Sequence, residues 1–267
     1  ELPGPRLPHD MAITENYSIL MDLPVCVDTE ALQRGRWRSV YRPELGSRFA
    51  VIPRHGKVEN IRWFRASACY IYHVVNAWED GDELVMVAHK VASPVANSEQ
   101  SNAPEFERML QNLQMHAELW EWRFNLRTGE TSERCLDQVN AEFPSTNSRE
   151  QGYPSRYGYA VTIGPVPTLR FDGIRKYDFR TGEHQQVRFG EGICGSESPF
   201  APSTQAEQED DGYLLSFVQD EVNNRSELWI YDARNLQAGP CARLAIPQRV
   251  PLGFHACWVE GKDLKTV

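Results

Sequence analysis

Short runs in which hydrophobic and polar residues alternate make up much of the chain, and they predict β-strands. Such runs lie at residues 17–23, 49–53, 68–75, 83–91, 158–163 and 213–219. They are rich in β-branched and aromatic residues and are bounded by Gly, Asn and Asp, as is typical of strands and turns. One segment has helical spacing instead, with an apolar face formed by Phe106, Met109, Leu110 and Leu113. The pattern therefore predicts an all-β fold with a short helical insert.

A strand-turn-strand unit recurs along the chain, in residues 119–130, 174–183 and 228–236. Trp122, Tyr177 and Tyr231 hold the equivalent place in the three copies, 55 and then 54 residues apart. Strand-rich repeats of about 50 residues are typical of the blades of a β-propeller. Between two strands of the last copy, Asn223-Asn224 predicts a hairpin tip.

Composition narrows the class of protein. The 267 residues are 41% hydrophobic and 24% charged, which is typical of a soluble globular protein. No apolar run is long enough to predict a membrane span. The net charge of -9 argues against nucleic acid as a partner, because phosphates are bound by basic surfaces.

Six cysteines are spread along the chain without CxxC pairs, so neither a zinc knuckle nor a thioredoxin-type site is predicted. Cys69 and Cys257 lie within strand-like runs and are expected to be small buried thiols. Without a disulfide framework, the expected location is the reducing cytoplasm.

Three histidines lie in apolar, strand-like frames: His9, His73 and His255. An imidazole among such neighbours is expected to be buried, and both of its ring nitrogens then need partners. A metal ion on one nitrogen and a hydrogen-bond acceptor on the other satisfy both, and a neutral ring suits iron, zinc, copper or nickel. Taken alone, each histidine is explained more simply as a core residue with protein partners. The remaining histidines are expected at the surface: His55, His89, His116 and His184.

The chain resembles the carotenoid cleavage oxygenase family, which includes apocarotenoid oxygenases, lignostilbene dioxygenases and the retinal isomerohydrolase. The resemblance covers nearly the whole chain, and its motifs follow one another in the family's order. They are His9-Asp10-Met11-Ala12-Ile13-Thr14-Glu15-Asn16, residues 48–54, residues 73–79, Glu142-Phe143-Pro144, residues 156–159, residues 195–202 and Gly253-Phe254-His255.

The resemblance implies a seven-bladed β-propeller closed around an iron(II) ion, Fe(2+), held by four histidines. His9, His73 and His255 match the second, third and fourth ligands. The first ligand is expected upstream of Glu1, since the chain starts without methionine and the motif of that ligand is absent. Residues 1–267 are therefore interpreted as a single domain, an N-terminally truncated, C-terminal part of the propeller.

In the family, three of the ligands pass their second ring N–H to glutamates. By position, Glu142 matches the partner of His73, and Glu197 matches the partner of His255. The partner of His9 is expected upstream. A carboxylate behind a ligating imidazole fixes its tautomer and makes it a better donor. Without the resemblance, Glu142 would be interpreted as an ordinary carboxylate at the edge of a strand.

The implied reaction is oxidative scission of a conjugated C=C bond by dioxygen, giving two carbonyl fragments, with no general acid, nucleophile or organic cofactor. Partners are then O2 and an apolar polyene or stilbene. Aromatic residues near the frames are candidates for a substrate tunnel, although aromatic residues on propeller strands are more often plain core: Tyr70, Tyr72, Trp78, Phe254 and Trp258. Asp10 and Glu15 are expected to orient the strand beside His9, without a catalytic role.

Several alternatives stay open at this point. A lignin-derived stilbene can replace the carotenoid as substrate, the chemistry can be a non-oxidative isomerohydrolysis, and the propeller can be a binding scaffold without catalysis. The bond cleaved, contact with a membrane surface and the oligomeric state also stay open. Because the early blades are expected to be missing, open strand edges should make the 267 residues alone inactive and poorly soluble.

Overall fold

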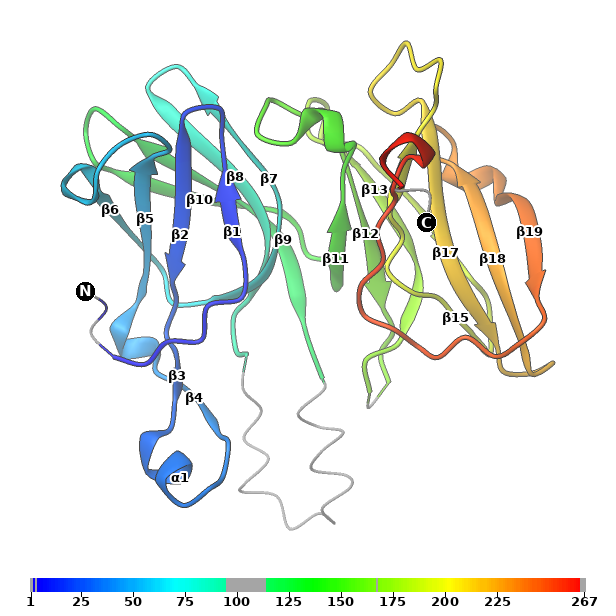
Figure 1. Cartoon of the computed structure of the whole chain (residues 1–267), viewed down its shortest axis with the longest axis horizontal. Coiled ribbons are helices and arrows are strands. Elements are labelled where there is room, and N and C mark those ends of the chain that lie inside the picture. The colour runs from blue at the N-terminus through cyan, green and yellow to red at the C-terminus, as the bar shows by residue number, and fades with distance from the viewer. Residues whose placement is uncertain (1, 3, 95–113, 167, 265–267) are drawn as a thin grey trace. The chain divides into compact units, whose positions relative to one another are not determined.

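The computed structural model describes residues 2, 4–94, 114–166 and 168–264 and divides the chain into two compact units. Unit 1 comprises residues 1–142, 151–154 and 165–169, and unit 2 comprises the other residues. Both are built from antiparallel sheets, which confirms the predicted all-β fold (Figure 1). The helix predicted from Phe106 to Leu113 lies outside the described residues.

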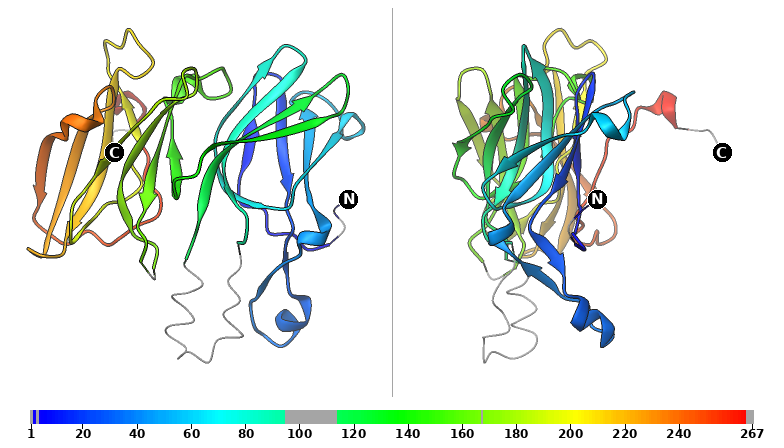
Figure 2. Two further views of the ribbon diagram at one scale, coloured as in Figure 1. Left: turned by 180° about the vertical axis from the view of Figure 1, so that it is seen from behind. Right: turned by 90° about the vertical axis from the view of Figure 1, so that its left-hand side faces the viewer.

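Unit 1 holds two four-stranded sheets and a two-stranded ribbon. The first sheet has the order β1-β2-β5-β6, with β1 (Met11–Ile13), β2 (Tyr17–Asp22), β5 (Ser47–Pro53) and β6 (Arg62–Ala66). The second has the order β10-β9-β8-β7, with β7 (Tyr70–Asp80), β8 (Glu83–Val91), β9 (Ala117–Asn125) and β10 (Thr131–Asp137). The ribbon pairs β3 (Val25–Val27) with β4 (Ser39–Tyr41) and carries the short helix α1 (Thr29–Gln33) at its tip (Figure 2).

Unit 2 holds two further sheets. The first has the order β11-β12-β13-β14, with β11 (Ala141–Ser145), β12 (Tyr157–Ile163), β13 (Phe171–Asp178) and β14 (His184–Arg188). The second has the order β15-β17-β18-β19, with β15 (Ile193–Cys194), β17 (Gly212–Asp220), β18 (Arg225–Asp232) and β19 (Pro240–Ile246). The short strand β16 (Phe200–Pro202) also pairs with β17. Ala141 and Glu142, at the start of β11, still belong to unit 1.

Single turns of 3-10 helix join several strands: η1 (Pro43–Leu45), η2 (Val58–Asn60), η4 (Ser148–Glu150) and η5 (Leu236–Ala238). A further turn, η6 (Gly261–Asp263), follows the last strand. In the ranges that the structure describes, no helix has both the length and the apolar character needed to cross a bilayer.

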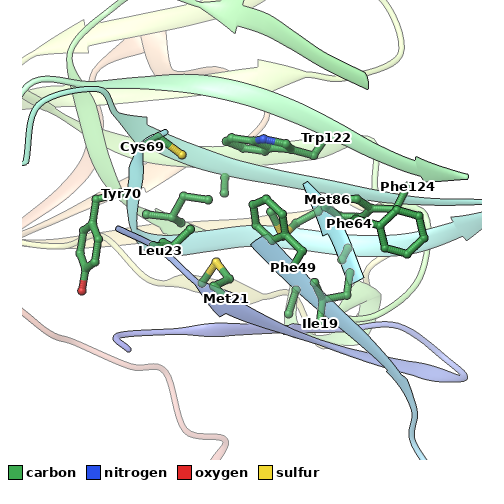
Figure 3. Packing of buried hydrophobic residues seen from close by; sticks show 14 of the residues in the cluster. Ile19, Met21, Leu23, Phe49, Phe64, Cys69, Tyr70, Met86, Trp122 and Phe124 are labelled. Atoms are coloured by element: carbon green, nitrogen blue, oxygen red, sulfur yellow. The ribbon is translucent and has the colours of Figure 1, made fainter. Parts of the chain in front are cut away.

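The core of unit 1 lies between its two four-stranded sheets. Phe49 of β5 and Phe64 of β6 pack against Phe124 of β9, with ring centroids 5.0 and 5.3 Å apart (Figure 3). Trp122 and Met86 from the second sheet are also completely buried there. Alternate residues of each strand reach this layer, which is why the alternating pattern of the sequence predicted the strands.

Unit 2 has its own core, in which Tyr159 of β12 stacks on Phe200 of β16 and Trp229 lies beside Tyr231 on β18. Trp122, Tyr177 and Tyr231, which hold the equivalent place in the sequence repeat, are all buried on the third of the four main strands of their sheets. The repeat is therefore a repeat of sheets, as predicted. The hairpin tip at Asn223-Asn224 is also confirmed, and Asn224 has a left-handed φ of 51°.

Two burial predictions are wrong. His89, expected at the surface, is completely buried, because β8 is the strand between β7 and β9 and is covered on both faces. Cys257, expected to be a buried thiol, is exposed, because it follows the last strand and joins no sheet among the described residues. Cys69 is buried, as expected.

Candidate metal centre

His73 lies on β7 at a point where the strand does not keep a regular register. Ile71 pairs with Lys90 of β8, and Val74 pairs with Ala88, so that β7 has one extra residue between the two pairs. A second shift follows between Val74 and Asn76. Bulges of this kind redirect a side chain and leave backbone groups out of the ladder. The irregular register therefore sets the direction of the His73 side chain.

Glu142, at the start of β11, holds the His73 ring from one side. Its Oε2 lies 2.7 Å from Nδ1 of His73. The Glu142 side chain is completely buried, and the His73 side chain is only 16% exposed. A carboxylate removed from water needs charge-assisted hydrogen bonds, and this imidazole supplies one. The pairing of His73 with Glu142 that the family resemblance implied is present within unit 1.

His9 precedes β1, in a segment that is not a strand, and the residue is exposed. The expectation of a buried histidine in a strand is therefore wrong for His9. Pro8 before it has no N–H to donate to a ladder, and the pairing with β2 starts at Met11. The His9 ring is nevertheless ordered by contacts with β7. Its Nδ1 lies 2.9 Å from the backbone oxygen of Tyr72, and its ring packs edge-on to the Tyr72 ring.

The rings of His9 and His73 lie side by side, with centroids 5.0 Å apart and planes at 86°. Two imidazoles that bind one ion through Nε2 at about 2.1 Å have centroids about 4.5–5.3 Å apart for bond angles of about 90–110°. The observed separation falls in this range. The two rings therefore fit adjacent positions around a single metal ion.

Hydrogen-bond partners determine which nitrogen of each ring is free to ligate. A backbone carbonyl only accepts, so Nδ1 of His9 carries the hydrogen, and Nε2 of the neutral ring keeps its lone pair. An ionised Glu142 imposes the same tautomer on His73. The donor set therefore fits a metal that prefers neutral imidazole.

Other residues of the motif that contains His73 form hydrogen bonds with neighbouring segments. Asn76 is completely buried; its Oδ1 accepts the N–H groups of Ala77 and Gly152, and its Nδ2 donates to the backbone oxygen of Tyr153. Glu79 accepts hydrogen bonds from the side chains of Thr14 and Asn16 and from the Asn16 N–H. No role was predicted for Asn76 or Glu79 from the sequence, although both lie in the family motif at residues 73–79.

The buried His89 is a third imidazole in this region. Burial lowers its pKa to about 4, with opposing electrostatic contributions from Glu142 and Asp137 and a further lowering by His73. The ring is therefore neutral at physiological pH. Burial and the charge of Glu142 also raise the pKa of Tyr72, so its phenol keeps its proton. Neither His89 nor Tyr72 therefore adds a charge beside the His73–Glu142 pair.

In unit 2, His255 follows the last strand and lies in a segment without regular structure. Its side chain is 61% exposed, so the expected burial in a strand is wrong for this residue. An apolar frame becomes a strand only where another strand pairs with it, and the described residues of unit 2 offer this segment no such partner.

Glu197 holds the His255 segment. Its Oε2 accepts the N–H of Ala256 at 2.6 Å and lies 3.2 Å from Nδ1 of His255. The pairing implied by the family resemblance is therefore present here too. The ring of Phe143 packs against the His255 ring at 5.4 Å and stacks on Phe254 at 5.8 Å. Phe143 has a left-handed φ of 53°, which is uncommon for a residue with a side chain.

The predicted site residues thus form two groups, with His9, His73 and Glu142 in unit 1, and His255 and Glu197 in unit 2. Within the described residues of each unit, no three His, Cys, Asp or Glu side chains gather to hold a metal ion. Of the aromatic tunnel candidates, Tyr70 is a core residue, whereas Phe254 and Trp258 are about half exposed. Whether any of them lines a tunnel stays a prediction.

Comparison with known proteins agrees with the fold and with the motifs. Residues 1–260 match the family described as retinal pigment epithelial membrane protein. A carotenoid 9,10(9',10')-cleavage dioxygenase of Crocus sativus is 36% identical over 99% of this chain and 50% of its own length. An isoeugenol monooxygenase of Pseudomonas nitroreducens is 32% identical over 97% of this chain and 56% of its own length.

Solved structures share the fold. Lignostilbene dioxygenase of Pseudomonas brassicacearum superposes with a TM-score of 0.83 at 26% identity, covering 96% of this chain and 55% of that one. A cobalt-substituted apocarotenoid oxygenase of Synechocystis superposes with a TM-score of 0.82 at 22% identity, covering 96% of this chain and 53% of that one.

These matches, together with antiparallel sheets that carry histidine–glutamate pairs, define the class of protein. The chain belongs to the carotenoid cleavage oxygenase family, whose fold is a seven-bladed β-propeller. It spans about half the length of the two curated relatives described above.

Proposed function

We propose that the whole protein is a non-heme iron(II) dioxygenase that cleaves a conjugated C=C bond of a carotenoid or apocarotenoid into two carbonyl products. The observation that carries this proposal is the buried pair of His73 and Glu142 beside the His9 ring, in a chain whose relatives are named as carotenoid cleavage dioxygenases. If Glu142 were replaced by a residue that cannot orient His73, a binding scaffold without catalysis would be favoured instead.

In this proposal, the Nε2 atoms of His9, His73 and His255 bind the metal. Iron(II) held by neutral imidazoles supplies the activation of dioxygen. Glu142 and Glu197 keep the hydrogen on Nδ1 of their histidines and offset the charge of the ion. For His9, the Tyr72 carbonyl fixes the tautomer without adding charge.

The neighbouring groups suit a reaction that needs no proton donor from the protein. The Tyr72 phenol keeps its proton, since burial and the charge of Glu142 raise its pKa. The neutral His89 is completely enclosed and unavailable to substrate. What these residues contribute is a fixed, largely apolar setting for the imidazoles, in which an apolar substrate replaces water.

The test is turnover of an apocarotenal by the purified whole protein loaded with iron(II). We expect consumption of one O2 for each C=C bond broken and the appearance of two aldehyde or ketone products. His73→Ala and Glu142→Ala should abolish turnover, whereas His116→Ala, which replaces an exposed histidine, should leave it unchanged. Absence of cleavage with every polyene and stilbene offered, despite bound iron, would contradict the proposal.

A second candidate is cleavage of a phenolic stilbene. It is favoured by the likeness to the lignostilbene dioxygenase and by the relative named isoeugenol monooxygenase, because isoeugenol is a phenol with a conjugated side chain. The ratio of kcat/KM for a hydroxystilbene to that for an apocarotenal decides between the two substrates. Incorporation of labelled oxygen from 18O2 separates both from a non-oxidative isomerohydrolase, whose products would carry no label.

A further inference from the structure

The carboxylate of Asp10, between His9 and β1, bridges two parts of unit 1. Its Oδ1 accepts the N–H of Met11 at 2.7 Å, and its Oδ2 accepts the N–H of Val74 at 2.8 Å. Met11 is the first residue of β1, and Val74 follows His73 on β7. One side chain therefore joins the segment of one predicted metal ligand to the strand of the other.

The place of this bridge on β7 is significant because the register shifts on both sides of Val74. A bulged strand leaves backbone groups without ladder partners, and a buried N–H without an acceptor is costly. Asp10 supplies an acceptor to Val74, and Nδ1 of His9 donates to the carbonyl of Tyr72. The side chains of His9 and Asp10 thus form hydrogen bonds with the backbone of Tyr72 and Val74, on either side of His73. In a regular sheet, the backbone of a neighbouring strand would form such hydrogen bonds.

We propose that Asp10 is a positioning residue that sets the distance and angle between the His9 and His73 rings by clamping the bulge of β7 to the start of β1. This inference rests on the proposed function, because it treats the two imidazoles as ligands of one ion. Both hydrogen bonds of Asp10 go to backbone groups, so it acts on the two rings through the chain.

Glu79 provides a matched control. It is also a carboxylate that holds the β1–β2 region to β7, through Thr14 and Asn16, but it acts at the far end of β7, six residues beyond His73. Removing either carboxylate should lower the thermal stability. Only the loss of Asp10 should change the relation of the two rings.

The experiment compares Asp10→Ala, Asp10→Asn and Glu79→Ala in the whole protein by titration with Co2+, followed by visible absorption. We expect Asp10→Ala to weaken Co2+ binding at least about tenfold and to change the cobalt spectrum, by analogy with other residues that orient ligands. Asp10→Asn keeps one acceptor and should give an intermediate affinity. Glu79→Ala should bind within about twofold of the wild type, which is the scatter expected for a residue remote from the ligands.

The metal-free protein gives a second readout that does not depend on the proposed function. In wild type, the amide of Val74 should be protected from hydrogen exchange, and nuclear Overhauser effects should connect the His9 and His73 rings. Both should be lost in Asp10→Ala and kept in Glu79→Ala; if Asp10→Ala does not fold, Asp10→Asn carries the comparison. Unchanged ring contacts or unchanged cobalt affinity in the Asp10 variants would overturn the positioning role. Failure of the wild type itself to bind cobalt would instead contradict the proposed function, and the ring contacts would still test the clamp.

Discussion

Glu142 and His73 form a buried carboxylate–imidazole pair in which Oε2 lies 2.7 Å from Nδ1, and the carboxylate has no exposure to water. A buried carboxylate is retained where it interacts with a positive charge or fixes a proton. Here the second reason applies, because Glu142 fixes the proton on Nδ1 of His73, and the ring that it orients lies against a second imidazole, that of His9.

Replacing Glu142 by Gln should lower the affinity for Co2+ or iron(II) about 10–100-fold, which is the usual effect of removing a carboxylate behind a ligating histidine. The amide has the same shape and still accepts from Nδ1, but it supplies no charge to offset that of the ion. Equilibrium titration with a competing chelator measures the change. Glu79→Gln is the matched control and should bind normally; equal affinities for wild type and Glu142→Gln would argue against the role given to this pair.

Removing the Glu197 carboxylate should release the segment that carries His255. Its Oε2 accepts the Ala256 N–H at 2.6 Å, so Glu197→Ala should speed hydrogen exchange at that amide about tenfold or more, as expected when a charge-assisted hydrogen bond is lost. Glu260→Ala is the control, since Glu260 lies in the same segment as His255 and pairs with Lys262 and with Arg149 of η4. Equal protection of Ala256 in wild type and Glu197→Ala would show that other contacts hold the segment.

Lys90 and Glu133 give a prediction for the stability of unit 1. The Lys90 ammonium donates to Glu133 Oε2 at 3.1 Å and to the Ser67 hydroxyl, and it lies 3.8 Å from the centre of the Trp120 ring. Glu133→Gln leaves this largely buried cation without its counter-charge and should lower the free energy of unfolding at pH 7 by about 1–3 kcal/mol.

The effect should depend on pH. Burial raises the pKa of Glu133, but hydrogen bonds from Ser67 and Lys90 outweigh it and hold the pKa below the ordinary 4.5. A depressed carboxyl pKa contributes stability that is present above the unfolded pKa and is lost as the pH falls through the folded one. Urea unfolding should therefore show a gap between wild type and Glu133→Gln at pH 7 that narrows below pH 4.5. A gap that stays constant or widens in acid would contradict this assignment.

The alternating pattern predicted the strands β2, β5, β7, β8, β12 and β17, because period-two burial is a local consequence of packing on a sheet, and the recurring unit predicted the repeat of sheets. Short strands such as β3 and β16 were not predicted. It also pointed to His73, which lies on a strand as expected. The burial of His89 had a signal that was overlooked: residues 84–91 form a nearly continuous apolar run, which is typical of a strand covered on both faces. The bulges of β7 had none, because a register depends on the partner strand as well as on the sequence.

The surroundings of His9 and His255 were not predictable for a related reason. Both lie among apolar residues, but burial depends on which segment packs over them, and that is a long-range property. The role of Glu79 was equally hidden, since a carboxylate that accepts backbone N–H groups looks in the sequence like any exposed acid. Asp10 was expected to orient the strand beside His9, but its hydrogen bond to Val74 of β7 was not predictable. Only the resemblance to a known family singled out Glu142 and Glu197 among 37 acidic residues.

The reactivity of the cysteines should differ, because Cys69 is buried whereas Cys241 and Cys257 are exposed. Burial raises the pKa of the Cys69 thiol to about 11, with an opposing hydrogen bond from Ser47, whereas Cys241 and Cys257 are exposed. At pH 7.5, a thiol reagent should therefore modify Cys241 and Cys257 rapidly and Cys69 only after unfolding, because the thiolate is the reactive form. Mass spectrometry of peptides from the native protein identifies the modified residues, and rapid modification of Cys69 would show that β7 is open to solvent.

The most direct measurement is X-ray absorption at the iron edge of the purified whole protein loaded with iron(II), compared with His9→Ala, His73→Ala and His255→Ala. In the wild type we expect stoichiometric iron with a shell of nitrogen and oxygen, outer-shell scattering from several imidazole rings and no sulfur. In each variant we expect a smaller imidazole signal or loss of iron. Sulfur in the first shell, or an imidazole signal that is the same in the wild type and all three variants, would contradict these expectations.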